Sequence, residues 1–131
     1  MLSERRLAVV VTSGDFDTLL EMTRTAGEAT EAGAAVRVFF RDESIPAICR
    51  PEVALRLIPA GGTPPEASVS AVSSALARLA ASGDARLYAC SSSLYVWGVN
   101  SADLIPPISG ARGLIAFLAE DLAGATDVMT Y

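Results

Sequence analysis

The chain has 131 residues, the usual size of one domain; 51% of them are hydrophobic, but charges interrupt every apolar run before it reaches the length of a membrane span. The net charge is −5 and the ten arginines are scattered, so no basic stripe indicates binding to nucleic acid. The sequence lacks histidine and lysine, which excludes histidine triads, histidine–metal sites and Schiff-base chemistry.

The first half of the chain alternates between strand and helix patterns. The apolar run Leu7–Thr12 is typical of a strand buried on both faces, and the residues 13–15 (Ser-Gly-Asp) break it. A helical pattern follows over about Asp17–Ala32, and Gly33 is placed to end it. A second strand is predicted at Val36–Phe40, followed by the polar residues 41–43.

The middle of the chain has weaker signals. Ser44 and the proline at position 46 indicate a short helix that Pro51 limits. Leu55–Ile58 predicts a brief strand or an extended crossover. Thr63–Glu66 then reads as a capping box with two prolines, which predicts a helix as far as about Ser82.

The last third continues the alternation. Arg86–Ala89 predicts a strand, and Ser91–Trp97 a short helix ended by glycine. Leu104–Ile108 contains two prolines, so it suits a short edge strand or a connector. We expect Ser109 to cap a helix as far as about Ala123, and Asp127–Tyr131 to form a last strand.

This alternation predicts a single α/β domain over residues 1–131, with a mostly parallel sheet and helices on both of its faces. In such sheets the sites gather beyond the carboxyl ends of the strands. The residues 13–15, 41–43 and 90–91 all fall at such ends, so we expect a common site there.

Cys90 is the residue most indicative of function, because it stands between an apolar strand and a short helix. Amide N–H groups at a helix start are unpaired and carry partial positive charge, which favours the nucleophilic thiolate. Ser91, Ser92 and Ser93 begin the helix and offer hydroxyl groups to a sulfur bound on Cys90. The alternative is a buried cysteine that only fills space.

Four further positions are weaker candidates for this site. Cys49 is either a resolving thiol for Cys90 or a small apolar residue, since its spacing from Cys90 fits neither a CxxC pair nor a zinc site. Arg41 and Arg50 bring positive charge to the thiol or form surface ion pairs. Asp15, after Gly14, suits a helix N-cap better than a site carboxylate.

Tyr95 and Trp97 lie close to the thiol in sequence. An aromatic pair in that position lines a site, packs in the core or meets another subunit, and the sequence does not separate these alternatives.

The sequence resembles the DsrE/DsrF-like family of small sulfur-relay proteins. The resemblance rests chiefly on Leu87–Gly98 (Leu-Tyr-Ala-Cys-Ser-Ser-Ser-Leu-Tyr-Val-Trp-Gly), with support from Val9–Gly14, Val36–Phe40, Gly113–Ala123 and Asp127–Tyr131. It implies a three-layer α/β/α sandwich with a five-stranded parallel sheet, assembled as a homo-oligomer (a trimer or hexamer) or a mixed ring. It also implies that Cys90 carries sulfur as a persulfide and passes it on.

The expectation is therefore a cytoplasmic sulfur carrier, or sulfurtransferase-like protein, without a metal or organic cofactor. Its partners are a sulfur donor and acceptor, either proteins or small thiols, and neither a nucleic acid nor a membrane. Two alternatives remain. One is a thiol-redox protein in which Cys49 resolves oxidised Cys90, and the other is a non-catalytic module for binding a small ligand or for assembly.

Overall fold

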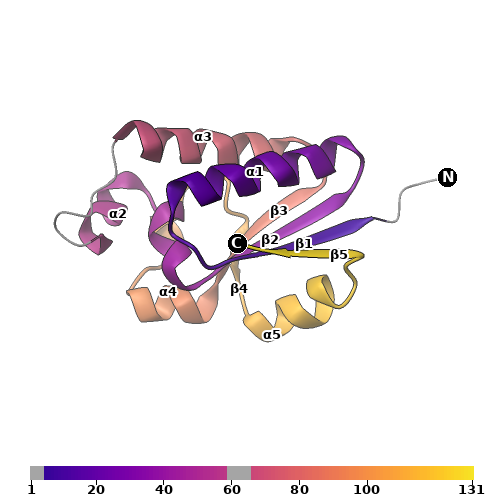
Figure 1. The fold of residues 1–131 in the computed structure, drawn as a ribbon. Helices are drawn as coiled ribbons and strands as arrows, with labels where there is room; N and C mark the ends of the chain where they lie inside the picture. Colours follow the sequence, from indigo (N-terminus) through magenta and orange to yellow (C-terminus); the bar gives the residue numbers. More distant parts are fainter. Residues whose placement is uncertain (1–4, 59–65) are drawn as a thin grey trace.

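The computed structural model describes residues 5–58 and 66–131. Five parallel strands form one sheet in the order β4-β3-β2-β1-β5. In chain order the strands are β1 (Arg6–Val11), β2 (Ala35–Phe40), β3 (Ala85–Cys90), β4 (Gly110–Arg112) and β5 (Asp127–Thr130). Helices cover both faces of the sheet (Figure 1). The predicted three-layer α/β/α sandwich with a parallel five-stranded sheet is confirmed.

One face of the sheet is covered by the two long helices α1 (Phe16–Glu31) and α3 (Glu66–Ala81), which lie side by side in Figure 1. Most of the buried apolar side chains belong to this layer. They include alternate residues of the central strands and the inner faces of the helices, namely Leu7, Val9, Val11, Val36, Val38, Phe40, Leu87, Leu19, Met22, Val72, Leu76 and Leu79. Burial of this face accounts for most of the hydrophobic stabilisation.

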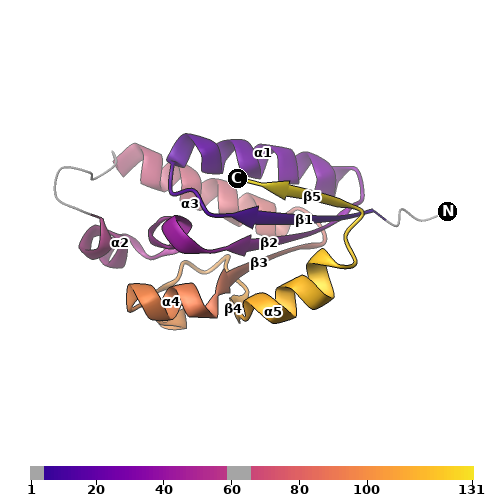
Figure 2. The ribbon, with the colours of Figure 1, turned by 60° about the horizontal axis from the view of Figure 1, so that its bottom comes forward.

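The opposite face is covered by α4 (Ser91–Trp97), α5 (Leu114–Phe117) and a π-helical turn, η3 (Leu118–Leu122), which continues α5. Figure 2 shows α4 and α5 together on this side of the sheet. Its fully buried cluster is small and consists of Ala8, Phe39, Cys90 and Phe117. The two faces of the sheet are therefore packed very unequally.

The remaining elements lie along the carboxyl edge of the sheet. They are the 3₁₀ segments η1 (Asp42–Ile48) and η2 (Ser101–Asp103) and the short helix α2 (Pro51–Leu57). The prediction of a strand or an extended crossover at Leu55–Ile58 was wrong. Pro51 occupies the first helical turn, where proline is tolerated, so it begins α2 instead of only limiting the preceding helix.

The predictions for the C-terminal third were partly wrong. Leu104–Ile108 is a connector, as one alternative held, and not an edge strand. The edge strand is β4, so Ser109 caps no helix: its N–H donates to the Leu87 carbonyl at 2.7 Å. Gly110 has φ +150°, a backbone angle that is incompatible with an α-helix, so the helix begins only at Leu114.

Two further observations bear on the earlier expectations. The residues 63–65 of the predicted capping box lie outside the described residues, although α3 follows them as expected. Within the part of the chain that the structure describes, no helix has the length and apolar character needed to cross a membrane.

Candidate functional site

Cys90 ends β3 and is also the N-cap residue of α4, with extended backbone angles (φ −66°, ψ 120°). It caps the helix through no side-chain hydrogen bond. Gly98 ends α4 in the left-handed conformation (φ 70°), as the sequence predicted. The thiol therefore stands at the carboxyl edge of the sheet, at the start of a helix of seven residues.

The Cys90 side chain is buried, with 3% of the residue exposed. It packs with Ala8 and with a stacked aromatic pair, Phe39 and Phe117, whose ring centroids are 4.6 Å apart. Phe117 comes from α5, so this helix lies over the layer that contains the thiol. The buried Cys90 side chain therefore has little contact with solvent, and α5 contributes part of its cover.

Asp42, which the sequence analysis included only as part of the segment 41–43, fixes α4 to the end of β2. Its N–H donates to Ser93 Oγ at 3.0 Å, and its carbonyl accepts from Trp97 Nε1 at 2.9 Å. Asp42 has φ +54°, an unusual value for a residue other than glycine. Ser93 and Trp97 thus have structural roles, whereas Ser91 and Ser92 are exposed beside Cys90.

An arginine stands next to Cys90 in sequence register on each side, one directly after β2 and one on β4. On one side the pairing of Phe40 with Ala89 places Arg41 level with Cys90, and extended backbone directs it to the same face. Its Nε lies 3.3 Å from the Asp42 carboxylate yet makes no hydrogen bond, although that nitrogen is buried. Arg41 therefore forms the ion pair that one alternative held, at a position next to the strand end that carries Cys90.

On the other side Cys90 is in register with Arg112 of β4, which the sequence analysis missed. Arg112 Nε lies 3.0 Å from Asp121, and Nη2 lies 2.6 Å from Glu120. Its guanidinium also covers the Tyr88 ring at 5.1 Å. The hydrogen bond to Glu120, and then the two nearby carboxylates, raise the pKa of Arg112, so it stays charged.

A signal for Arg112 was present in the sequence. Glycine is unfavourable within helices, and Gly110 and Gly113 flank this arginine. The spacing indicates that residues 110–112 lie outside the predicted helix.

Gly14 and Asp15 have structural roles in the neighbouring turn. A Cβ at Gly14 would come within 2.5 Å of the Glu43 carbonyl oxygen, so this close approach requires glycine. Asp15 is the N-cap of α1, accepting from the N–H and the hydroxyl of Thr18, each at 2.9 Å. The Thr18 N–H, and then its hydroxyl, lower the pKa of Asp15.

Cys49 is separated from Cys90. Both thiols are free, but Cys49 packs in the large core whereas Cys90 belongs to the small cluster around Phe117. The Cys49 thiol donates to the Ile45 carbonyl at 3.3 Å, and burial, with a smaller effect of Asp103, raises its pKa to about 11. Arg50 donates to the Ala102 carbonyl at 3.2 Å. The structure does not bring Cys49 to the thiol as a resolving partner.

Tyr95 does not line a closed site. It is 87% exposed on the outer face of α4, next to Val96, which is 81% exposed. On α5, Ile115 is 77% exposed. We refer to these three residues as the outer apolar surface.

Comparison with known proteins identifies the family. The model of the DsrE/DsrF-like family matches residues 5–123, which include Cys90 and both of its arginine neighbours. The chain belongs to the DsrE/DsrF-like family. A solved structure, that of a protein of unknown function from Methanobacterium thermoautotrophicum, has a TM-score of 0.71 and 15% sequence identity. The alignment covers 95% of this chain and 98% of that one, which shows a shared fold.

Among curated proteins, no significant match to the sequence was found. Membership of the DsrE/DsrF-like family supports a sulfur-relay-type role at the level of the family.

Proposed function

We propose that this DsrE/DsrF-like protein carries sulfane sulfur as a persulfide on Cys90. The observation that carries the proposal is the place of Cys90 within the family match, at a strand–helix junction on the carboxyl edge of a parallel sheet. The sequence has neither histidine nor lysine, so among its side chains the thiol is the natural nucleophile.

The proposed reaction requires no redox partner. The Cys90 thiolate attacks the outer sulfur of a donor persulfide, the S–S bond of the donor breaks, and the donor leaves as a thiolate. Cys90 then holds the transferred sulfur. In the second step an acceptor thiolate attacks that outer sulfur, and Cys90 leaves as a thiolate. Both steps follow the chemistry of thiol–disulfide exchange.

The surroundings of Cys90 support this proposal in two ways. Arg112 of β4 is in register with Cys90 and Arg41 directly follows β2, so an anionic outer sulfur would have an arginine on each side, each already paired with carboxylates. The cover formed by Phe117 would keep a stored persulfide from thiols in solution. We infer that loading and release accompany a movement of α5 or α4, and that Ser91 and Ser92 donate hydrogen bonds to the exposed sulfur.

The test is intact-protein mass spectrometry after brief exposure to a small-molecule sulfane-sulfur donor. We expect the wild-type protein and Cys49→Ser to gain one sulfur atom, and Cys90→Ser to gain none. Absence of a gain on wild-type protein that is folded by circular dichroism, with a donor that loads a control thiol, would contradict the proposal.

The burial of Cys90 also favours a second candidate, a non-catalytic assembly or ligand-binding module in which this thiol is structural. In that case Cys90→Ala would leave assembly and ligand binding unchanged, and no sulfur would be gained in the mass measurement.

We further propose that the protein is a homo-oligomer and that the outer apolar surface faces another copy. Tyr95, Val96 and Ile115 are large apolar side chains on neighbouring helices, and exposed groups of this kind are typical of interfaces. Light scattering coupled to size-exclusion chromatography tests the oligomeric state. We expect Val96→Asp to shift the protein toward the monomer and Leu55→Asp, an exposed control on α2, to leave it unchanged.

A further inference from the structure

The face of the sheet that holds Cys90 also carries a row of arginines, at the opposite end of the strands. Arg6 of β1 precedes Ala8 by two residues, Arg37 of β2 precedes Phe39, and Arg86 of β3 precedes Tyr88. Ala8, Phe39 and Tyr88 belong to the small cluster beneath α5. Because side chains alternate along a strand, the three arginines project from this same face.

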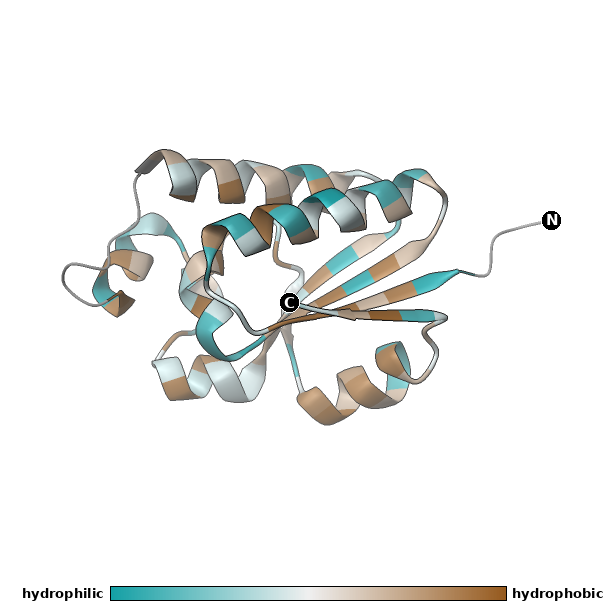
Figure 3. Ribbon diagram, in the orientation of Figure 1, coloured by the Kyte–Doolittle hydropathy of each residue, from teal (hydrophilic) through white to brown (hydrophobic). Residues whose placement is uncertain are grey.

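The three arginines are also neighbours across the sheet. Arg37 is in register with Arg86 of β3 and with Ala8 of β1, two residues beyond Arg6. Adjacent strands lie about 4.8 Å apart, so like charges here repel one another. Figure 3 shows hydrophilic segments on the strands near their N-terminal ends, in contrast to the apolar middle of the sheet.

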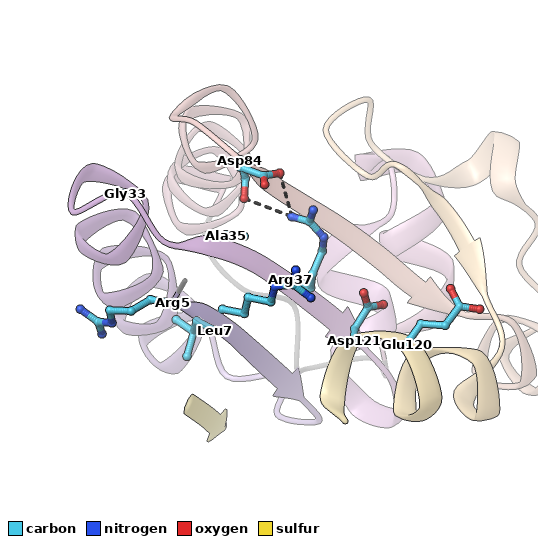
Figure 4. A pocket seen from close by; sticks show the side chains of 9 residues that line it. Arg5, Leu7, Gly33, Ala35, Arg37, Asp84, Glu120 and Asp121 are labelled. Atoms are coloured by element: carbon cyan, nitrogen blue, oxygen red, sulfur yellow. Dashed lines mark hydrogen bonds and ion pairs between the residues drawn. The ribbon is translucent and has the colours of Figure 1, made fainter. Parts of the chain in front are cut away.

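A hollow of about 400 Å³ lies at this end of the sheet, lined by Arg6, Arg37 and Asp84 and by Glu120 and Asp121 of η3 (Figure 4). Arg86 is in register with Arg37 but is not among the lining residues. The floor of the hollow includes Leu7 and Ala35. Arg6 extends toward the residues that follow η3. A Cβ placed on Gly124 would lie 3.4 Å from Arg6 Nη1. The volume is within the range of small-molecule sites.

The carboxylates around this hollow are already paired. Asp84 lies 3.0 Å from Arg37 Nη1, Glu120 and Asp121 are bound by Arg112, and Asp127 lies 3.6 Å from Arg5. In the described part of the chain, Arg6 and Arg86 have no carboxylate partner within ion-pair distance. Two guanidinium groups on either side of Arg37 are therefore available to an anion.

We propose that this row of arginines binds the tetrahedral oxyanion group of a small molecule, such as a phosphate or sulfate group. Guanidinium groups donate several hydrogen bonds in a planar fork that matches such oxygens. This site is distinct from Cys90 and its occupancy does not depend on persulfide chemistry.

The test is the binding of inorganic phosphate, measured by calorimetry and by the shift in thermal unfolding. Sodium chloride of equal ionic strength is the control. We expect saturable binding to the wild-type protein, weakened about tenfold or more for each guanidinium removed in Arg6→Gln and in Arg86→Gln. Arg78→Gln, on α3 at the opposite face, makes the same change in charge and should bind like the wild type.

Sulfate and acetate in the same assay separate a tetrahedral oxyanion site from general attraction of anions: we expect sulfate to compete with phosphate and acetate to fail. Absence of saturable phosphate binding would overturn the proposal. Equal binding by the wild type and the Arg6→Gln/Arg86→Gln double variant would overturn it too, because the anion would then lie elsewhere. Both variants change exposed side chains, so circular dichroism should show a native fold.

Discussion

The two cysteines lie in different buried clusters of the domain, and their surroundings differ. Cys49 packs in the large core, in the short connection between η1 and the start of α2, and its thiol donates to the Ile45 carbonyl. Cys90 belongs to a cluster of four buried residues, at a strand–helix junction with an arginine on β4 and another directly after β2. A thick core provides stability, whereas a thin layer can open at a smaller energetic cost and expose a reactive group.

The comparison also shows that burial alone does not distinguish a structural thiol from a reactive one. Cys49 and Cys90 are each 3% exposed. They differ in what surrounds the sulfur and in how much packing must be disturbed to reach it. The variants described below test this difference between the two cysteines, and those with the greatest predicted change in stability come first.

Replacing one buried phenyl ring on each face of the sheet separates solvent access to Cys90 from the stability of the whole protein. Phe117→Ala and Phe40→Ala each remove a fully buried phenyl group, at an expected cost of about 3–5 kcal/mol of unfolding free energy measured in urea. Only Phe117→Ala should accelerate alkylation of Cys90, because Phe117 covers the thiol and Phe40 packs on the other face.

Where these variants fail to fold, Phe117→Leu and Phe40→Leu make the same comparison at a smaller cost. Equal acceleration of alkylation by both changes would mean that Cys90 reacts through global unfolding, and not through local opening of the α5 cover.

The pH dependence of stability should report Cys49. Burial raises the pKa of this thiol from its ordinary 9.0 to about 11, so the folded state holds the proton more tightly than the unfolded state. The stabilisation is complete below pH 9.0 and is lost as the pH rises through about 11. We expect a loss of at most roughly 3 kcal/mol.

Urea unfolding of the wild type and of Cys49→Ala across this interval isolates the contribution of the thiol from those of other groups. The difference in unfolding free energy between the two proteins should shrink as the pH rises. A difference that is constant with pH would show that Cys49 titrates in the folded protein as it does in the unfolded chain.

Gly14 tests whether the turn beside the site depends on close backbone approach. Gly14→Ala would bring a methyl group against the Glu43 carbonyl, and we expect it to destabilise the protein by about 1–3 kcal/mol. Gly27→Ala in α1 has open space and should stabilise by about 0.5–1 kcal/mol. Urea unfolding gives both values, and two changes of the same sign would contradict the packing argument.

Asp15 should affect stability without affecting the thiol. Asp15→Asn keeps a good N-cap and should change the melting temperature little, whereas Asp15→Ala should lower it. Neither variant should alter the rate at which Cys90 gains sulfur. A slower gain in Asp15→Asn at unchanged stability would instead give this carboxylate a role in the site.

Much of the fold could be predicted from the sequence because strong local signals coincide with its elements. The apolar strand at Leu7–Thr12 and the helix ended by Gly33 are examples, and both are confirmed. The region 104–123 was harder, because β4 has only three residues and a π-helical turn follows α5. Such short elements are determined by tertiary pairing, which periodicity does not record.

The site could be predicted only in part for a related reason. The strand–helix junction at Cys90 is local and was visible in the sequence, and the family match covers it. The neighbours Asp42 and Arg112 reach α4 and β3 through loop conformation and strand register, so sequence spacing did not connect them. The packing of Cys49 and Cys90 in different clusters likewise follows from tertiary structure, because η1 and α2 carry Cys49 into the large core.

The most direct test of the account is to locate transferred sulfur in the wild-type protein. The protein is treated with a sulfane-sulfur donor at pH 7.5, trapped with an alkylating reagent under native conditions and digested for peptide mass mapping. We predict trapped persulfide on the peptide containing Cys90 and none on the peptide containing Cys49. Persulfide on Cys49, or on both cysteines equally, would contradict the account.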